Sequence, residues 1–376
     1  MRKLILQLHL WIGLTAGAIL SVVGVTGSAY VFQPELTRLL YADLYRAKDP
    51  EAVPVNPEVV IQAAEEAFRG KVSNVHFPLR ELENYILKVE GKKEWLFYDA
   101  STGNYLGEMK ERRGVLDKVL EVHRGLVVGE IGSVITGICA LLMALVLLSS
   151  GLYLWWPRKK KQFKDGLRLK PNASFKRRSY DLHNVFGFYF SVPLFLAAIT
   201  GAYFAFSVEM HAVVDSITGA KELTPNPKAL HSVYQPGVQP MTLQQAMELM
   251  NSSKYKGYHK RNLTMPKDSV GHVYFSLTNA SDIDAGAELR PMVYLDQYTG
   301  KPLYAYDPVA APAGRRLLRN WFVPIHFGEV GGYVTRVLWF ILGLLPATLW
   351  VTGLLIWRGK RKKKNKKAVT GKGAIA

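Results

Sequence analysis

The sequence predicts an α-helical membrane protein with four transmembrane helices in two parallel repeats and two extracytoplasmic α+β domains. Three observations support this fold class: four long apolar stretches, clusters of basic residues beside them, and an order of motifs that occurs twice. A membrane-spanning helix needs about 20 predominantly apolar residues. Four stretches meet this requirement, at residues 4–32, 131–156, 185–208 and 333–357.

The net charge of +18 is concentrated next to these stretches. Residues 158–180 contain ten Lys or Arg and one acid, residues 358–376 contain nine basic residues and no acid, and Arg2 and Lys3 open the chain. Such clusters mark the cytoplasmic ends of spans. We therefore expect a multi-pass membrane protein with both termini in the cytoplasm. The basic segments can hold anionic membrane lipid, and no nucleic-acid partner is expected.

The spans and their flanks divide the chain into eight segments. For the first span, a cleaved signal peptide ending near Gly27-Ser28-Ala29 is the alternative, but its apolar part is long compared with the roughly 7–15 residues of a signal peptide. The expected order is helix 1–33, extracytoplasmic domain 34–125, helix 126–157, basic loop 158–180, helix 181–208, extracytoplasmic domain 209–325, helix 326–357 and basic tail 358–376.

Each extracytoplasmic domain is predicted to place one helix over an antiparallel sheet. Asn56 and Pro57 are a helix cap and a first helical residue, and Thr242 with Gln245 forms a capping box that starts the second helix. Strands are expected near residues 72–77, 85–89, 94–98 and 105–108, and near 273–278, 292–295 and 303–306. Residues 209–240 are expected to be an irregular linker.

The first and third spans share a pattern. His9 precedes Thr26-Gly27 by 17 residues, counted to the threonine, and His183 precedes Thr200-Gly201 by the same number. Two spans per repeat give both halves one orientation, so we expect a pseudo-two-fold axis along the membrane normal. His9 and His183 would then lie at equal depth near the inner side.

The remaining segments repeat as well. An Asp-x-x-Thr-Gly-x-x-Leu motif occurs at residues 99–106 and 296–303, where it predicts a strand, a tight turn and a strand. His123 and His326 follow these motifs, and a Gly-x-x-x-Trp pattern occurs at residues 151–155 of the second span and 353–357 of the fourth. The second histidine pair is expected near the outer side.

Facing histidines, one from each half, can supply both axial ligands of a b-type haem. Gly13 and Gly17 share the helix face of His9, and Gly187 and Ser191 have the same offsets from His183, so small residues would lie beside a flat ring. Gly13 and Gly17 could instead serve helix packing. Arg124, next to His123, could pair with a haem propionate.

Other chemistries fit less well. A zinc site needs three or four ligands, and a proton relay would more often use acids, which are scarce in the spans. The single cysteine, Cys139, allows no CxxCH haem attachment. His211 is a spare ligand candidate for an outer haem. A substrate cleft is expected between the outer domains, flanked by four residues that could equally be interface anchors: Arg112, Arg113, Arg124 and Trp321.

The duplicated Asp-x-x-Thr-Gly-x-x-Leu hairpin resembles the PepSY domain. Two such domains interleaved with four spans, with Leu-His-x-x-x-Gly opening the first and third, resemble the PepSY-associated transmembrane family over nearly the whole chain. The family includes iron-regulated inner-membrane proteins and ferric-siderophore reductases with two b haems. The resemblance implies that His9, His183, His123 and His326 are the axial ligands.

The resemblance also implies reduction of a ferric siderophore or another ferric chelate outside the membrane, with release of ferrous iron. The sequence has no G-x-G-x-x-G nucleotide fingerprint, so electrons would come from a quinol, a flavoprotein or a cytoplasmic reductant. Two alternatives remain open. One is a non-enzymatic PepSY-type sensor or peptidase regulator, and the other is a small permease.

Overall fold

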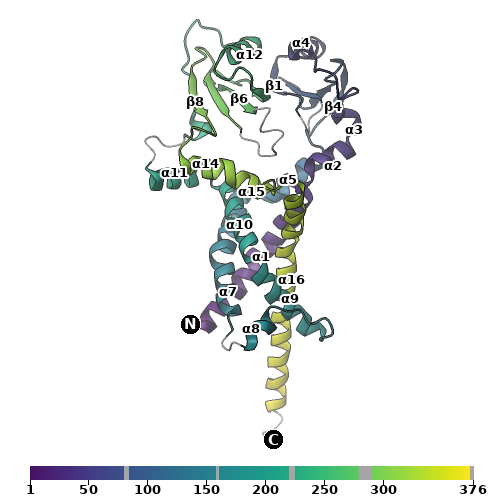
Figure 1. The fold of residues 1–376 in the computed structure, drawn as a ribbon, viewed down its shortest axis with the longest axis vertical. Helices are drawn as coiled ribbons and strands as arrows, with labels where there is room; N and C mark the ends of the chain where they lie inside the picture. Colours follow the sequence, from purple (N-terminus) through teal and green to yellow (C-terminus); the bar gives the residue numbers. More distant parts are fainter. Residues whose placement is uncertain (80–83, 158–160, 220–224, 279–289, 373–376) are drawn as a thin grey trace. The chain divides into compact units, whose positions relative to one another are not determined.

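The computed structural model describes residues 1–79, 84–157, 161–219, 225–278 and 290–372 (Figure 1). The chain divides into two compact units, each assembled from segments that are far apart in sequence. The helical unit comprises Met1–Val31, Val119–Ser207 and Ile325–Ala376, and the sheet unit comprises Phe32–Lys118 and Val208–Pro324. Of the predicted basic segments, residues 158–160 and 373–376 lie outside the described part of the chain.

The helical unit is a bundle built mainly on three long helical stretches and one bent helix pair. The N-terminus lies at the same end of this bundle as the described end of α16 and the short helix α8 (Figure 1). Its helices are α1 (Arg2–Val31), α5 (Val115–Gly125, which begins in the sheet unit), α6 (Gly129–Leu142), η1 (Met143–Leu147), α7 (Leu148–Trp155), α8 (Lys161–Gly166), α9 (Phe175–Tyr189), α10 (Ser191–Ala205), α15 (Val323–Phe327, which also begins in the sheet unit) and α16 (Gly332–Lys372).

Three described helical stretches are long and apolar enough to cross a membrane, namely Arg2–Val31, Gly129–Trp155 and Gly332–Arg361. Together α9 and α10 also meet the criteria, but they are bent by 66° where they join. The chain is therefore a multi-pass membrane protein. A fourth span made of the bent pair stays a prediction, as does the cytoplasmic location of the termini.

The predicted third span, residues 181–208, is not one continuous helix in the structure. The helix stops at Phe190, whose backbone has φ −96° and ψ 8°, and a new helix begins at Ser191. Pro193 explains the break, because its ring would collide with the carbonyl group of Tyr189 in a continuous α-helix and it has no N–H to donate. Its counterpart in the first span is Ile19, and α1 runs through without interruption.

Helices α1 and α16 pack very closely through glycine. A Cβ on Gly24 would lie 2.2 Å from the carbonyl oxygen of Gly343, and one on Gly343 would lie 2.3 Å from Oγ of Ser28. The Ser28 hydroxyl donates to the Phe340 carbonyl at 2.7 Å. Small residues that let two backbones meet are typical of helix pairs in membranes, so the contact holds the first span against the last.

The described residues of the sheet unit form eight antiparallel strands in one sheet, in the order β4-β3-β2-β1-β5-β6-β7-β8. Strands β1 and β5 are neighbours at the centre of the sheet. The strands of the first half, β1–β4, lie on one side of this junction, and those of the second half, β5–β8, lie on the other. The strands are β1 (Val72–His76), β2 (Tyr85–Val89), β3 (Trp95–Tyr98), β4 (Tyr105–Met109), β5 (His259–Thr264), β6 (His272–Thr278), β7 (Met292–Asp296) and β8 (Pro302–Tyr306).

The sequence predicted two separate α+β domains, and this part of the fold class was wrong. The two halves share one sheet because β1 pairs with β5, with Val75 opposite Leu263. Strand β5 was missed altogether, since the segment His259-Lys-Arg-Asn reads as a polar loop. In the structure only Leu263 of this strand is fully buried, so backbone pairing on both sides, rather than an apolar pattern, defines β5.

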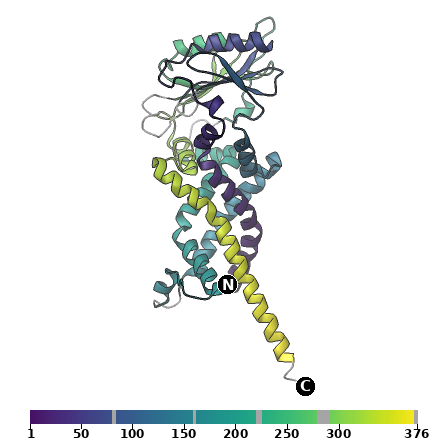
Figure 2. The same ribbon diagram turned by 90° about the vertical axis from the view of Figure 1, so that its right-hand side faces the viewer.

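Two helices cover one face of this sheet, α4 (Pro57–Phe68) and α12 (Leu243–Ser252), and Figure 2 shows them along the same side. Apolar residues from both helices and from β1, β2, β3, β5, β6 and β7 form one core there. The predicted caps are present, with Asn56 accepting from the Glu58 amide and Thr242 and Gln245 bonded reciprocally.

Shorter helices complete the sheet unit, and some lie within the predicted linker 209–240, which is therefore partly helical. They are α2 (Gln33–Leu40), α3 (Ala42–Tyr45), α11 (Ser207–Thr218, which begins in the helical unit), η2 (Pro227–Ala229), α14 (Ala313–Arg316) and η3 (Leu317–Phe322).

The two Asp-x-x-Thr-Gly motifs form hairpins with the same hydrogen bonds. Oδ1 of Asp99 accepts from the Thr102 amide at 2.8 Å, and Oδ1 of Asp296 accepts from the Thr299 amide at 2.8 Å. Gly103 and Gly300 follow with φ of 74° and 69°, a region that glycine adopts without steric cost. Each buried carboxylate thus organises the turn that the sequence assigned to it.

Candidate functional site

The helical unit brings the four predicted histidines together in two pairs. His9 of α1 and His183 of α9 have ring centroids 6.3 Å apart, with an angle of 86° between the ring planes. His123 of α5 and His326 of α15 have centroids 6.1 Å apart, with an angle of 43°. In both pairs one ring comes from each half of the chain. Four sequence positions that span 317 residues therefore converge as two local sites.

The inner pair is held by hydroxyl and carbonyl groups of neighbouring helices. Nδ1 of His9 is 2.9 Å from Oγ of Ser150. Nδ1 of His183 is 3.0 Å from the Leu349 carbonyl oxygen and 3.1 Å from Oγ1 of Thr352. A carbonyl can only accept, so Nδ1 of His183 carries the proton. Ser150 uses its own hydroxyl hydrogen toward the Val146 carbonyl, so Nδ1 of His9 is also the donor.

The outer pair is held in the same way. Nδ1 of His123 lies 2.8 Å from the Val23 carbonyl oxygen, to which it must donate. Nδ1 of His326 lies 3.1 Å from Oγ1 of Thr200, which donates its own hydrogen to the Leu196 carbonyl. With the proton on Nδ1, Nε2 keeps its lone pair in all four rings. A metal-binding histidine is commonly oriented by a hydrogen bond of this kind from its other nitrogen.

Each histidine ring also lies against a glycine of an adjacent helix. A Cβ added to Gly151 would be 3.2 Å from Cε1 of His9, and one added to Gly353 would be 3.3 Å from Cε1 of His183. These two glycines were noted in the sequence only as markers of the repeat. The signal that could have identified them as contacts of the inner rings is that they occupy matched positions in the second and fourth spans.

Two further glycines seat the outer rings. A Cβ on Gly27 would be 2.8 Å from Cε1 of His123, and a Cβ on Gly201 would be 3.1 Å from Cε1 of His326. These are the glycines of the repeated Thr-Gly dipeptide, so this motif supplies the glycine that contacts each outer histidine ring. In the second half it also supplies Thr200, whose hydroxyl accepts from His326. No larger side chain fits beneath these rings without moving them.

Residues 6–360 match the family described as the PepSY-associated TM region. The chain belongs to this family. No curated protein matches the chain. The match covers both histidine pairs and all eight strands, so both units of this PepSY-associated transmembrane protein lie within the region that defines the family.

The other residues predicted to surround the cofactors lie as follows. A Cβ on Gly13 would have Leu147 at 3.7 Å and one on Gly187 would have Leu349 at 4.0 Å, so a methyl group would fit at either position in ordinary van der Waals contact with its neighbour. Arg124 follows His123 in α5, and its carbonyl oxygen accepts from the Thr136 hydroxyl at 2.9 Å.

His211, the spare ligand candidate, belongs to the sheet unit rather than to the helical unit that holds both pairs. It is buried in α11, where burial first and then the charge of Arg319 lower its pKa to about 4. The neighbouring Asp215 accepts from Arg315 at 3.2 Å in a buried ion pair. Among the substrate candidates, Arg112, Arg113 and Trp321 also belong to the sheet unit, whereas Arg124 belongs to the helical unit.

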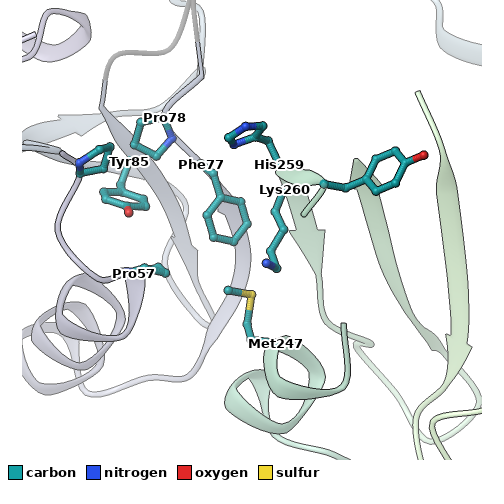
Figure 3. A pocket seen from close by; sticks show the side chains of 9 residues that line it. Pro57, Phe77, Pro78, Tyr85, Met247, His259 and Lys260 are labelled. Carbon is teal, nitrogen blue, oxygen red and sulfur yellow. The ribbon is translucent and has the colours of Figure 1, made fainter. Parts of the chain in front are cut away.

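A pocket of about 210 Å³ lies in the sheet unit at the junction of its two halves (Figure 3). Phe77 and Met247 lie next to each other in its lining, and Nζ of Lys260 donates to Oδ1 of Asn251 at 2.6 Å. Its lining combines prolines and aromatic rings with one lysine and one histidine: Pro54, Pro57, Phe77, Pro78, Tyr85, Met247, Tyr258, His259 and Lys260. This set suits binding better than redox chemistry.

Within the described residues, no group of three or more His, Cys, Asp or Glu side chains is placed to hold a metal ion. A zinc site of the usual three or four protein ligands therefore has no candidate there. The two histidine pairs remain, and a pair of nitrogen donors suits a metal whose other positions are filled by a macrocycle.

Proposed function

We propose that this protein is a dihaem b-type transmembrane electron-transfer protein that reduces a ferric chelate, such as a ferric siderophore, on the extracytoplasmic side. The observation that carries the proposal is the spacing of the two histidine pairs, whose ring centroids are 6.3 and 6.1 Å apart. The proposal also predicts that the protein is an oxidoreductase that releases ferrous iron.

The spacing fits two imidazoles that share one metal ion. A metal–imidazole bond is about 2 Å long, and a ring nitrogen lies roughly 1.2 Å from its ring centre. Two rings on opposite sides of one ion therefore have centroids about 6.4 Å apart. Rings that merely packed together could approach more closely than the 6.3 Å of His9 and His183.

The surroundings of the rings fit a haem as well. The Nδ1 hydrogen bonds leave Nε2 of each ring free to coordinate. Gly13 and Gly187 add no side chain to the helix faces that carry His9 and His183. Residues His9 and His183 would hold one haem and His123 and His326 the other, and Arg124 would pair with a propionate next to His123.

When bound, a haem with two histidine ligands supplies one-electron transfer. The protein residues set the distance between the two pairs. His123 contacts α1 at Val23, 14 residues after His9, which corresponds to about 21 Å along the helix. Such a separation is consistent with two haems at different depths of a hydrocarbon core about 30 Å thick.

The basic loop and tail support the direction of transfer. They favour the cytoplasm as the side of the termini, and His9 lies seven residues after Arg2, the first helical residue of α1. Electrons would enter on that side from a quinol, a flavoprotein or a cytoplasmic reductant, since no nucleotide-binding motif is present in the chain.

The test is the absorption spectrum of the purified full-length protein, produced with adequate haem, in oxidised and reduced form. We expect a Soret band and a reduced α band, with two haems per chain. Changing His9 or His183 to alanine should remove one haem, and changing His123 or His326 should remove the other. A protein without these bands, or four variants with unchanged haem content, would contradict the proposal.

A second candidate function is supported by the pocket at the junction of the sheet halves (Figure 3). Its prolines and aromatic rings suit a peptide, as expected for a non-enzymatic sensor or peptidase regulator. This candidate predicts that the protein carries no chromophore and tolerates changes of all four histidines. The same spectrum therefore separates the two functions.

A further inference from the structure

The sheet face opposite α4 and α12 carries an unusual polar stripe at its centre. We define the stripe by six residues that are all half-buried: Asn74, His76, Asn262, Thr264, Tyr274 and Ser276. On one side it borders an apolar cluster around Ile86 and Phe97, and on the other a cluster around Met292 and Tyr294. Antiparallel sheets commonly have one polar face, but here the polar residues are half-buried and lie between two apolar clusters.

The stripe consists of two cross-strand rows. In the first row Asn74 lies opposite Thr264, which lies opposite Tyr274. The second row places His76, Asn262 and Ser276 opposite one another. Three strands about 4.8 Å apart and two rows about 7 Å apart give an area of roughly 10 by 7 Å, which matches the size of a small chelate.

Two carboxamide groups in the stripe are held in fixed orientation. The Nδ2 groups of Asn74 and Asn262 both donate to Oγ1 of Thr264, at 2.7 and 3.1 Å. This leaves both Oδ1 atoms shielded from solvent and without a hydrogen-bond partner. If either amide were rotated by 180°, its N–H group would instead be buried without a hydrogen-bond partner. A buried polar group without a partner destabilises a fold, so these two indicate a site whose partner is a ligand.

Several positive charges lie near the stripe, and the acidic groups Glu94 and Glu111 act electrostatically on one of them, Lys88. The guanidinium of Arg319 lies 5.9 Å from the ring of Tyr306 and contacts Met292, which is opposite Ser276. Lys88 is opposite Asn74 on the other side. Burial first, and then the charges of Arg112, Arg113 and Arg261, lower the pKa of His76 well below its usual value. Neither row contains an acidic side chain among its described residues.

We propose that the polar stripe binds an anionic, carboxylate-bearing metal chelate that also carries hydroxyl or amide hydrogen-bond donors, of the hydroxycarboxylate class. The arginine and lysine charges attract the carboxylates, and the Oδ1 atoms of Asn74 and Asn262 accept from the donors. As a statement about the electron acceptor, this inference rests on the proposed function and names its substrate class.

The test measures binding of gallium citrate to the full-length protein by equilibrium dialysis. Gallium(III) resembles ferric iron in charge and size but is not reduced, so binding is measured without electron transfer. We expect saturable binding that is at least tenfold tighter than binding of inorganic phosphate, of metal-free citrate or of the cationic gallium–desferrioxamine complex. Equal affinity for any of these three would overturn the proposal.

The decisive variant is the double change Asn74→Leu and Asn262→Leu, which keeps side-chain size. It should weaken gallium citrate binding at least tenfold while the thermal midpoint stays equal or rises, because two unsatisfied buried groups are removed. Arg319→Gln, a second variant that keeps the stem, should also weaken binding. Asn251→Leu and Lys256→Gln, exposed changes in and after α12, are the matched controls and should bind normally.

Unchanged affinity in the double variant and in Arg319→Gln would overturn the proposal. The outcome for the proposed function is separate, because the absorption spectrum is recorded on the same samples. Haem bands without gallium citrate binding reject the stripe as a site and leave the dihaem proposal intact. Gallium citrate binding without haem bands rejects the dihaem proposal and leaves the site.

Discussion

The imidazole of His123 lies on the backbone of Gly27, so closely that a Cβ there would be 2.8 Å from Cε1 of the ring. Likewise, a Cβ on Gly201 would be 3.1 Å from Cε1 of His326. Real Cβ atoms do not approach to 2.8 Å, so an alanine at position 27 must displace a ring that also donates to Val23 of the same helix. The positions of both outer histidine rings therefore depend on glycines of the spans.

Gly27→Ala should reduce occupancy of the outer haem or shift its low-spin electron paramagnetic resonance signal, and leave the inner haem unchanged. Gly201→Ala should act in the same direction but less strongly, because its contact is looser. Gly359→Ala, where a Cβ meets Lys176 at an ordinary 3.5 Å, is the control. Wild-type spectra in Gly27→Ala would show that the glycine does not position the ring.

The Ser150 hydroxyl orients His9 through Nδ1 at 2.9 Å. Ser150→Ala removes this acceptor, and loss of such an orienting partner typically weakens metal binding by about 10- to 100-fold. We expect faster loss of the inner haem to an apo-haemoprotein acceptor, measured at the Soret band. Ser149→Ala is the matched control, because the Ser149 hydroxyl is exposed and bonds only within its own helix, to Leu145 and Val146. Equal haem loss in both variants would contradict this role.

The Asp99 carboxylate links hairpin stability to pH. Burial raises the pKa of Asp99, but hydrogen bonds from Ser101, the Lys48 amide and Thr102 outweigh it and lower the pKa to about 2. The unfolded value is about 3.9. Because the folded pKa is the lower one, the stabilisation is fully present above the unfolded pKa and is lost as the pH falls toward 2. This stabilisation amounts to roughly 2–3 kcal/mol.

The thermal midpoint of the wild-type protein should therefore fall between pH 5 and pH 2.5. Asp99→Asn should lower the midpoint at pH 6 and flatten this dependence, because asparagine has no charge to lose. Asp49→Asn is the control, since Asp49 accepts only from the exposed Glu51 amide at 3.2 Å. A pH profile of Asp99→Asn parallel to the wild type would exclude Asp99 as the source.

Gly300→Ala should destabilise the protein more than Gly103→Ala. Both glycines have positive φ, at 69° and 74°, where alanine costs about 1 kcal/mol. At Gly300 a Cβ would also lie 2.8 Å from Leu249, whereas at Gly103 the nearest atom is Val55 at 3.5 Å. Gly91→Ala, with φ of 77° and nothing within 4 Å, isolates the backbone effect. The thermal midpoint should therefore be lowest for Gly300→Ala and higher for Gly103→Ala and Gly91→Ala. Equal midpoints for the three variants would contradict the packing argument.

Local sequence signals predicted most individual elements. The caps at Asn56 and Thr242 and the two Asp-x-x-Thr-Gly turns depend on contacts within a few residues, so the sequence is sufficient to predict them. Pro193 was also a local signal for the helix break at Phe190. The long apolar stretch around it, however, led to the prediction of one span over residues 181–208. Strand β5 could not be predicted this way, because its polar residues are defined by the strands on either side.

The sequence by itself determined which segments are apolar, which turns form, and that four histidines recur at matched positions, because these depend on residue type and spacing. Only the tertiary structure decided that β1 and β5 join two halves into one sheet and that each histidine ring rests on a glycine. It also decided that two buried amide oxygens near the centre of the sheet lack partners. These are contacts between residues far apart in the chain, and no local propensity encodes which distant surfaces meet.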